Sequence, residues 1–591
     1  MKKRHRPQTK LTPQPLCVNV LRERYLAPGE HTVDDVRHRV AIALASVESP
    51  RKRADYADIF LQAMRAGFIP GGRIQAAAGL QTAATLINCF VQPVLPPMHR
   101  AAWHEGVRQA MVTMAAGGGV GYDLSDLPPR NDPHSLQEMP GLPSPLEFLD
   151  LMEQRVAQAI VHRDRRAAQM AVLRIDHPDV IAFIQRKRSG GLAHFNLSVS
   201  VTDAFMDKAF RDEIWDLRYQ PKGILNDQVS DRSIVYNRLP ARHVMQQLQD
   251  ATYACGEPGV IFIDQVNRDE GVTNQAPLRA ANPCGEQFLP DYGACNLGSI
   301  DLTRFVRSPF SLRAQFDLNR FADVARVAVR ALDNVIELTH WPLPEHVELA
   351  RRQRRIGLGF TGLGDALFML GLRYDSSAGC AFAARVARCL RDAACEASIR
   401  LAMERSSFPD LDALTYLTRP RAGSRLPEHL RRRIQQHGIR NSHRLSIAPT
   451  GSISLAFADN VSPGIEPIMG PQIWHRGRGA ATDETALVAD HAWRLFRSRF
   501  GGCARLPPAF LTAADVSPTS QLRMLASVTP FVDAGISKTI SIPTDYPRAA
   551  FDPLMRQAWL MGVKAFTCYR LNPNITPAMS TTSPDKRRRC E

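Results

Sequence analysis

The sequence predicts one large α/β unit, and three observations lead to this fold class. Segments typical of strands alternate with segments of helical periodicity from residue 17 to residue 572. Neither an internal repeat nor a linker of domain scale interrupts this alternation. Hydrophobic residues make up 44% of the 591 residues, which is enough for a large buried core.

The first half of the chain carries the clearest alternation. Residues 18–64 favour helices, because apolar residues recur at helical spacing in VDDVRHRVAIALASV. A Gly-rich turn at 69–74 precedes a short buried strand at 85–94, which prolines bound. A helix is expected at 101–116, and residues 117–127 join it to the next strand. An irregular Pro-rich loop is expected at 128–145 and a helix at 146–161. Residues 162–188 are expected to form a charged loop, a strand and a helix capped by Asp176.

The second half continues this pattern and completes the expected organisation. Further helices are predicted at 242–254, 321–339, 378–404, 427–437 and 551–561, and short strands at 259–263 and 565–569. The expected regions are a disordered basic N-terminus at 1–16, a mostly helical region at 17–84, a main domain at 85–571 and a flexible tail at 572–591.

The net charge of +16 indicates an anionic partner, such as a nucleic acid, a membrane surface or phosphorylated small molecules. The basic residues gather in short clusters without interleaved aromatic residues, which argues against nucleic-acid binding as the main function. The clusters lie at 2–6, 351–355, 431–433 and 586–589.

No apolar run reaches the length of a transmembrane helix, and the basic N-terminus lacks the apolar stretch of a secretory signal. A cytoplasmic protein is therefore expected. The eleven cysteines form no C-x-x-C, so neither a zinc ribbon nor another metal site is predicted. The cysteines in helical patterns are predicted to be small core residues: Cys255, Cys380, Cys389 and Cys395.

The segment AANPCGEQFLPDYGACNLGSIDL, residues 280–302, is the most informative stretch of the chain. Its first proline cannot donate a backbone hydrogen bond, and Gly285 permits backbone angles that other residues avoid, so a tight loop is predicted. The loop sets the thiol of Cys284 beside the carboxylate of Glu286 and the amide of Asn282. The alternative is a surface turn with a buried structural cysteine.

Two further segments favour a phosphorylated ligand. A small-residue turn follows the short strand RLSIA and opens a helix, which is how backbone N–H groups come to point at an anion. An ordinary helix cap by Thr450 or Ser452 is the alternative. The glycines in GGGVG, residues 117–121, let a ligand approach the backbone, or form a tight helix-to-strand turn. The small-residue turn after RLSIA consists of Pro449, Thr450, Gly451, Ser452, Ile453 and Ser454.

Taken together, these segments resemble the catalytic subunit of ribonucleotide reductase, and most closely the adenosylcobalamin-dependent class II. The resemblance covers most of residues 18–572 and is most specific in NPCGE with a second cysteine eleven positions later. The matching segments, in chain order, are NVLRERYL, NCFVQPV, GGGVGYDLSDL, VLRIDHPDVIAFI, NPCGEQFLPDYGACNLGSIDL, LDNVIELTHWPLP, RRIGLGFTGLGDAL, APTGSISL, DAGISKTISIP and AWLMGVKAFTCYR.

The resemblance implies a role for each residue of the candidate site. Cys284 matches the cysteine whose thiyl radical takes the 3′-hydrogen of the ribose. Glu286 matches the carboxylate that takes the proton of the 3′-hydroxyl, and Asn282 matches the amide that orders the ribose hydroxyls. Cys89 and Cys295 match the dithiol that supplies two electrons and becomes a disulfide.

The resemblance also implies the fold and the substrate. The fold is a ten-stranded α/β barrel of two antiparallel five-stranded halves, with the Cys284 loop as a finger through its centre. The turn at 449–454 matches the site of the substrate diphosphate, and Asn88 and Gly118 match contacts to the ribose or phosphate. Ribonucleoside diphosphates, a dithiol reductant of the thioredoxin kind, a dNTP effector and a homodimer are the implied partners; stable nucleic-acid binding is not implied.

The class assignment rests on the C-terminal part of the chain. Class I subunits relay a radical through two adjacent tyrosines, whereas this chain offers only Tyr569. No glycyl-radical segment is recognised. Adenosylcobalamin is therefore the expected cofactor, although no cobalamin-binding residue can be named from the sequence.

The chain departs from the family pattern in three places. The effector loop SKLRPxGA reads SDLPPRNDPHSLQ here, the substrate-side NSPT reads GGRI, and the tail ends in Cys590 without a second cysteine. A separate tail protein, external thiols or a missing segment are the alternatives for re-reduction. Two other functions stay open: a basic nucleotide- or RNA-binding protein with a decayed site, and a class I-like subunit with a separate radical partner.

Overall fold

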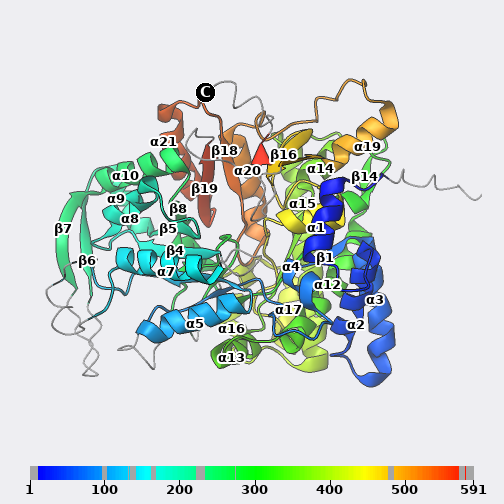
Figure 1. Ribbon diagram of the computed structural model, residues 1–591, viewed down its shortest axis with the longest axis horizontal. Helices are drawn as coiled ribbons and strands as arrows, with labels where there is room; N and C mark the ends of the chain where they lie inside the picture. The colour runs from blue at the N-terminus through cyan, green and yellow to red at the C-terminus, as the bar shows by residue number, and fades with distance from the viewer. Residues whose placement is uncertain are drawn as a thin grey trace, which may run out of the picture.

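The computed structural model describes residues 11–95, 103–130, 132, 141–160, 168–220, 233–272, 275–418, 420–476, 485–570 and 579–580. Within them, strands and helices alternate along the chain as predicted (Figure 1). No helix of the described residues combines the length and apolarity needed to cross a membrane. The tail beyond residue 571 lies outside the described residues apart from 579–580, so Cys590 is not placed.

An eight-stranded sheet is the largest sheet of the described chain. Five of its strands run parallel, because helical crossovers connect them. They are β2 (Cys89–Val91), β3 (Gly119–Asp123), β4 (Gln169–Arg174), β5 (Phe195–Val201) and β8 (Gly259–Phe262). Beyond β8 the sheet continues into antiparallel β19 (Ala565–Arg570) and then β18 (Thr539–Ile542), and β11 (Ala294–Cys295) pairs antiparallel with β2 at the other edge.

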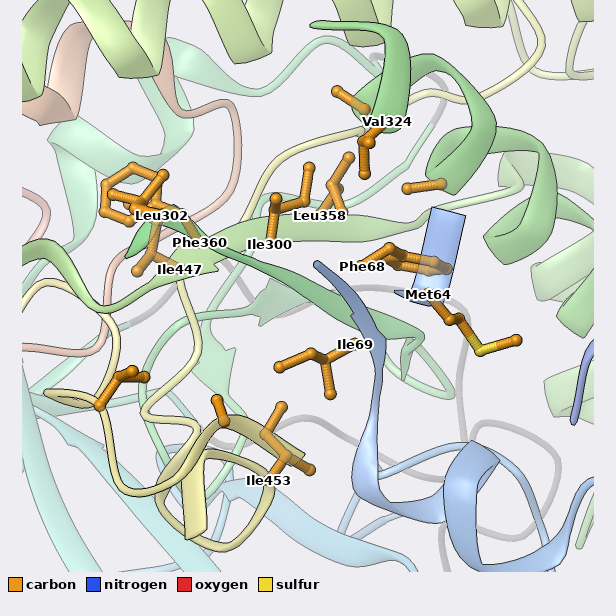
Figure 2. Packing of buried hydrophobic residues seen from close by; sticks show 14 of the residues in the cluster. Met64, Phe68, Ile69, Ile300, Leu302, Val324, Leu358, Phe360, Ile447 and Ile453 are labelled. Atoms are coloured by element: carbon orange, nitrogen blue, oxygen red, sulfur yellow. The ribbon is translucent and has the colours of Figure 1, made fainter. Parts of the chain in front are cut away.

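A smaller sheet of three strands lies beside a second set of helices. It contains β1 (Phe68–Pro70), β12 (Leu297–Asp301) and β15 (Gly357–Thr361), with β1 antiparallel and β15 parallel to β12. Figure 2 shows Ile300 of β12 and Leu358 and Phe360 of β15 along these strands, with Phe68 and Met64 nearby. Isolated parallel bridges join Leu358 to Leu445 and Ile447 to Ile536, so one further chain segment runs beside β15 and a second runs beside that segment.

Each sheet is buried by its own helices. The large sheet shares a core with α5 (Trp103–Ala115), α7 (Pro145–Ile160), α8 (Val180–Arg186), α9 (Asp203–Arg211) and α10 (Ala241–Cys255). The small sheet shares another with α2 (Val33–Ala45), α3 (Arg53–Ala66), α12 (Leu318–Leu338) and α15 (Ser377–Arg405). The N-terminal helices thus complete the main core instead of forming a core of their own.

The remaining elements lie between or around these layers. The helices are α1 (Pro15–Arg24), α4 (Gly72–Ala77), α11 (Ile263–Asp269), α13 (Pro344–Gln353), α14 (Leu363–Met369), α16 (Ala413–Leu417), α17 (Glu428–His437), α18 (Gly451–Ala458), α19 (His491–Phe500), α20 (Pro518–Val528) and α21 (Arg548–Leu560). The strands are β6 (Ile214–Tyr219), β7 (Ile234–Pro240), β9 (Ala280–Ala281), β10 (Phe288–Leu289), β13 (Val306–Arg307), β14 (Gln315–Phe316), β16 (Gln472–Arg476), β17 (Thr485–Ala489) and β20 (Met579–Ser580).

Three sequence predictions need correction. Asp176 does not cap a helix: α8 starts after Asp179, and the Asp176 carboxylate instead accepts a bond from Arg174 Nε at 2.8 Å. The strand expected at 85–94 shrinks to β2, partly because the N–H of Leu86 bonds to a threonine side chain. Ordered structure begins before residue 17, because Gln14 is buried and donates to Ala489 O at 2.9 Å.

Candidate active site

Residues 282–287 form a tight loop at the tip of the hairpin β9–β10. The N–H of Gly285 donates to Asn282 O at 3.0 Å, and Gly285 has a φ of +76°, which side chains rarely adopt. The side chain of Asn282 closes the loop from inside, because its Oδ1 accepts from the N–H of Gln287 at 3.0 Å. The loop predicted from the proline and glycine is confirmed.

Segments that are far apart in the sequence hold this loop by its backbone. The carbonyl of Glu286 accepts from the Ser446 hydroxyl at 2.9 Å and from the N–H of Gly535 at 2.8 Å. On the other side, the carbonyl of Pro283 accepts from Asn196 Nδ2, on β5, at 2.8 Å. Because these bonds use main-chain atoms, the side chains of the loop remain available for other contacts.

The thiol of Cys284 lies at the tip of the loop. Cys284 is exposed to solvent, although enough protein lies around it to disfavour a charge on the thiol. Apart from atoms of Gly285 itself and of its chain neighbours Cys284 and Glu286, a Cβ atom built on Gly285 would meet nothing within 4 Å, so the flank of Gly285 is open. Burial raises the pKa of Cys284 well above its ordinary value, and the charges of Glu286 and Cys89 raise it further. Cys284 is therefore a protonated thiol at neutral pH.

The carboxyl group of Glu286 is buried, with 1% of the residue exposed. Burial raises its pKa to about 7, and the nearby Asn282 amide lowers that pKa only in part. Among the described residues, neither Glu286 Oε2 nor Asn282 Nδ2 has a hydrogen-bond partner. Buried polar atoms normally have partners, so these two atoms are available to a ligand.

Cys89 and Cys295 lie directly opposite each other where β2 pairs with β11. Cys295 is fully buried and Cys89 is 9% exposed. Burial raises the pKa of Cys295 most, followed by a hydrogen bond with Cys89 and by the charges of Cys89, Glu286 and Cys284. The three thiols and the carboxylate thus lie within electrostatic reach of one another, which the sequence alone could not show.

Glycines on β3 let the loop pass this close to the dithiol. A Cβ atom on Gly119 would lie 3.1 Å from Cγ of Pro283 and 3.4 Å from Sγ of Cys89. A Cβ atom on Gly121 would overlap the carbonyl oxygen of Ala281, at the base of the hairpin. The glycine-rich segment therefore gives the finger room.

The predicted phosphate turn opens α18. Thr450 has a φ of +50°, and no side chain caps the helix, so the capping alternative is wrong. The Thr450 hydroxyl instead bonds to the Thr361 hydroxyl at 2.8 Å. Ser452 Oγ accepts from the Tyr25 hydroxyl at 2.9 Å, and Gly451 is exposed at the start of the helix. The first turn of α18 thus has no side-chain cap.

The other predicted substrate residues belong to this turn or lie directly before β2 and β3. Asn88 is half-buried, and its Oδ1 accepts from the backbone N–H of Arg73 at 3.3 Å. Gly118 is buried against the ring of Phe90. Ile453 and Ser454 turn their side chains into the core, so these two residues can meet a ligand only through their backbone.

Sequence reasoning missed four residues that support the site. Ser446 lies in the short strand RLSIA and Gly535 in the matching segment DAGISKTISIP, but their bonds to the finger leave no pattern in the sequence. Asn196 had no signal of its own, and Tyr25 belonged to the matching segment NVLRERYL without a role assigned to it. No group of three or more His, Cys, Asp or Glu side chains in the described part of the chain could hold a metal ion.

Comparisons with known proteins agree with this arrangement. Residues 88–569 match the family described as the ribonucleotide reductase barrel domain. A vitamin B12-dependent ribonucleoside-diphosphate reductase from Mycobacterium tuberculosis (strain CDC 1551 / Oshkosh) is 34% identical over 96% of this chain and 81% of its own length. A protein of the same name from Thermoplasma acidophilum is 29% identical, over 85% of this chain and 63% of its own. A vitamin B12-dependent ribonucleotide reductase from Streptomyces clavuligerus is 24% identical, over 84% and 58%. The chain belongs to the ribonucleotide reductase family.

Proposed function

We propose that the chain reduces ribonucleoside diphosphates to 2′-deoxyribonucleoside diphosphates, with adenosylcobalamin as cofactor, for the supply of DNA precursors. The observation that carries this proposal is the convergence of Cys284, Glu286 and the pair Cys89 and Cys295 from three separate segments. The names of the relatives from Mycobacterium tuberculosis and Thermoplasma acidophilum support both the substrate and the cofactor. A decayed site would have no reason to keep all of these groups together.

Each residue of the site carries out a different step of the proposed reaction. Cys284 takes the hydrogen atom from C3′ of the ribose and later returns one, while Glu286 takes the proton of the 3′-hydroxyl. A carboxyl group with a pKa of about 7 can accept that proton and give it back at neutral pH. The 2′-hydroxyl leaves as water, and Cys89 and Cys295 supply two electrons and two protons and become a disulfide. Asn282 Nδ2 donates to the ribose hydroxyls.

The surroundings of Cys284 fit the cofactor. When bound, adenosylcobalamin supplies the radical that makes the sulfur of Cys284 a hydrogen-atom acceptor. The thiol is accessible, and the flank of Gly285 is open. A recess beside the finger is lined, among others, by Gly285, Gly535 and Lys564. These residues would face the bound group.

The same proposal includes a ten-stranded barrel around the finger. Residues 294–301 pair with β2 through β11 and with β15 through β12, and so join the large sheet to the small one. The bridges from Leu358 to Leu445 and from Ile447 to Ile536 continue from β15 towards β18, at the far edge of the large sheet. These contacts support a ring of two five-stranded halves, with β19 antiparallel to β8 where the halves meet.

The proposal extends to partners. Each turnover leaves a disulfide between Cys89 and Cys295, so a dithiol reductant, such as a thioredoxin-like or separate tail protein, must restore the thiols. A homodimer and a dNTP effector rest on the family alone. The main domain at 85–571 would be the catalytic unit, with 17–84 packed into its core.

The test is anaerobic turnover of CDP and ADP with a dithiol reductant, with and without adenosylcobalamin, scored as deoxynucleotide. We expect product only with the cofactor, and none from Cys284→Ser. Cys503→Ser is the matched control, because Cys503 is also exposed but lies away from the predicted site segments. Wild-type protein that makes no product with cofactor and reductant present would overturn the proposal. Product without cofactor would favour a separate radical source.

A further inference from the structure

The start of α4 differs from the family pattern, because GGRI stands where NSPT is usual. The two glycines are needed for close packing. A Cβ atom on Gly71 would lie 2.7 Å from the carbonyl oxygen of Leu297, and one on Gly72 would lie 3.3 Å from the Tyr25 hydroxyl oxygen. Such a tight turn fixes the residue that follows, Arg73, at the first turn of the helix.

This turn adjoins the predicted phosphate site. The Cβ position of Gly72 is 3.7 Å from Cγ2 of Ile453, on α18. The Tyr25 hydroxyl that packs on Gly72 donates to Ser452 Oγ at 2.9 Å. The starts of α4 and α18 are therefore neighbours, and Figure 2 shows Ile69, just before this turn, near Ile453.

The side chain of Arg73 lies over the glycine-rich turn. Its backbone N–H donates to Asn88 Oδ1 at 3.3 Å, and its guanidinium Nη2 donates to the carbonyl of Gly117. Gly117 has a φ of +97°, and a Cβ atom there would overlap the guanidinium. Arg73 is thus held between Asn88 and Gly117, next to the predicted substrate residue Gly118, and the start of its helix adjoins the start of α18.

The phosphate turn has no cation of its own, because the segment 449–454 contains neither lysine nor arginine. A nucleoside diphosphate carries several negative charges, and the fork of a guanidinium matches phosphate oxygens. We propose that Arg73 is a substrate-binding residue whose guanidinium binds the diphosphate, held in place by the Gly117 carbonyl. The inference rests on the proposed function and deepens it, because it names the cation that would select phosphorylated substrates.

The experiment measures equilibrium binding of CDP, cytidine and inorganic pyrophosphate to the full chain, together with kcat and KM for CDP in the holoenzyme. The variants are Arg73→Gln and Arg73→Lys. Arg22→Gln is the matched control, because Arg22 is exposed on α1 and its loss changes the net charge equally. Thermal unfolding of each variant reports whether it folds.

We expect Arg73→Gln to weaken the binding of CDP and of pyrophosphate by about 10- to 100-fold, which is the effect of losing a charged hydrogen bond. The binding of cytidine should change less than about threefold. Arg73→Lys should recover part of the loss, and Arg22→Gln should bind as wild type does. If Arg73→Gln weakens cytidine as much as CDP, or leaves pyrophosphate binding unchanged, Arg73 only supports the Gly117 turn and the inference is overturned. Wild-type protein that binds CDP but makes no deoxynucleotide would refute the proposed function alone.

Discussion

The ionisation of Glu286 offers the most direct test of the site, because one substitution changes both stability and activity. In the folded chain the pKa of this carboxyl group rises from 4.5 to about 7, since burial disfavours its charged form. At 1.36 kcal/mol per pH unit, this difference corresponds to about 3 kcal/mol. Glu286→Gln removes the titration and keeps the shape of the side chain.

The sign follows from which state holds the proton more tightly. The folded chain keeps the proton of Glu286 up to about pH 7, whereas the unfolded chain loses it near pH 4.5. The wild-type free energy of unfolding therefore falls as pH rises through this window. Between pH 4 and pH 8, the free energy of unfolding of Glu286→Gln should rise by about 3 kcal/mol relative to that of wild type. Because both proteins share every other titrating group, the difference isolates Glu286.

Urea unfolding at pH 4, 6 and 8 measures this difference, and turnover of CDP across the same range measures the role in catalysis. Wild-type activity should rise as pH increases through about 7, because the ionised carboxylate accepts the 3′-hydroxyl proton. Glu286→Gln should lose about 100- to 10 000-fold in kcat, the usual contribution of a positioned base. A stability difference that does not change with pH would show that the carboxyl group is not buried in this way. Retained activity would refute its role as base.

Three other substitutions test neighbouring parts of the site. Cys89→Ser removes half of the dithiol, so multiple turnover should fall to background, whereas Cys395→Ser, a buried control in α15, should stay active. Equal activities of the two variants would contradict the dithiol assignment. Ser446→Ala removes the hydroxyl that bonds to the finger and should lower the free energy of unfolding by about 1 kcal/mol in urea titrations; an unchanged midpoint would mean that this bond gives no support. Gly121→Ala sets a methyl group against Ala281 and should cost about 3 kcal/mol or prevent folding, as thermal unfolding would report; normal stability would disprove the close passage of the hairpin.

Much of the fold could be predicted because local rules dominate it. Apolar periodicity gave α12 and α15 to within a few residues, since their buried stripes repeat at helical spacing. Pairing between distant strands has no such local rule. The prediction that Asp176 caps a helix failed because Asp179 follows three residues later, and either aspartate suits a helix start.

The candidate site likewise has parts that the sequence predicts and parts that it does not. The finger was predictable because a proline, a glycine and three reactive side chains fall within a few residues. Its supports were not, because Gly535 contributes a backbone N–H and Asn196 a single amide from a strand that is far away in sequence. A main-chain donor is the same in every residue, so the sequence holds no trace of it. The meeting of Cys89 and Cys295 depends equally on strand pairing.

The placement of Cys284 at the tip of the finger has a physical reason that separates it from nucleophilic cysteines. A nucleophile needs a thiolate, so its surroundings lower the pKa of the thiol with positive charges. Transfer of a hydrogen atom needs the intact S–H bond, and here burial together with Glu286 and Cys89 raises the pKa of Cys284. A cation beside this thiol would favour the thiolate and oppose the chemistry. The cation proposed for the substrate, Arg73, is instead held at the Gly117 carbonyl near the phosphate turn, where charge is useful. The uncharged thiol of Cys284 and the charge proposed to bind phosphate thus belong to different segments of the chain.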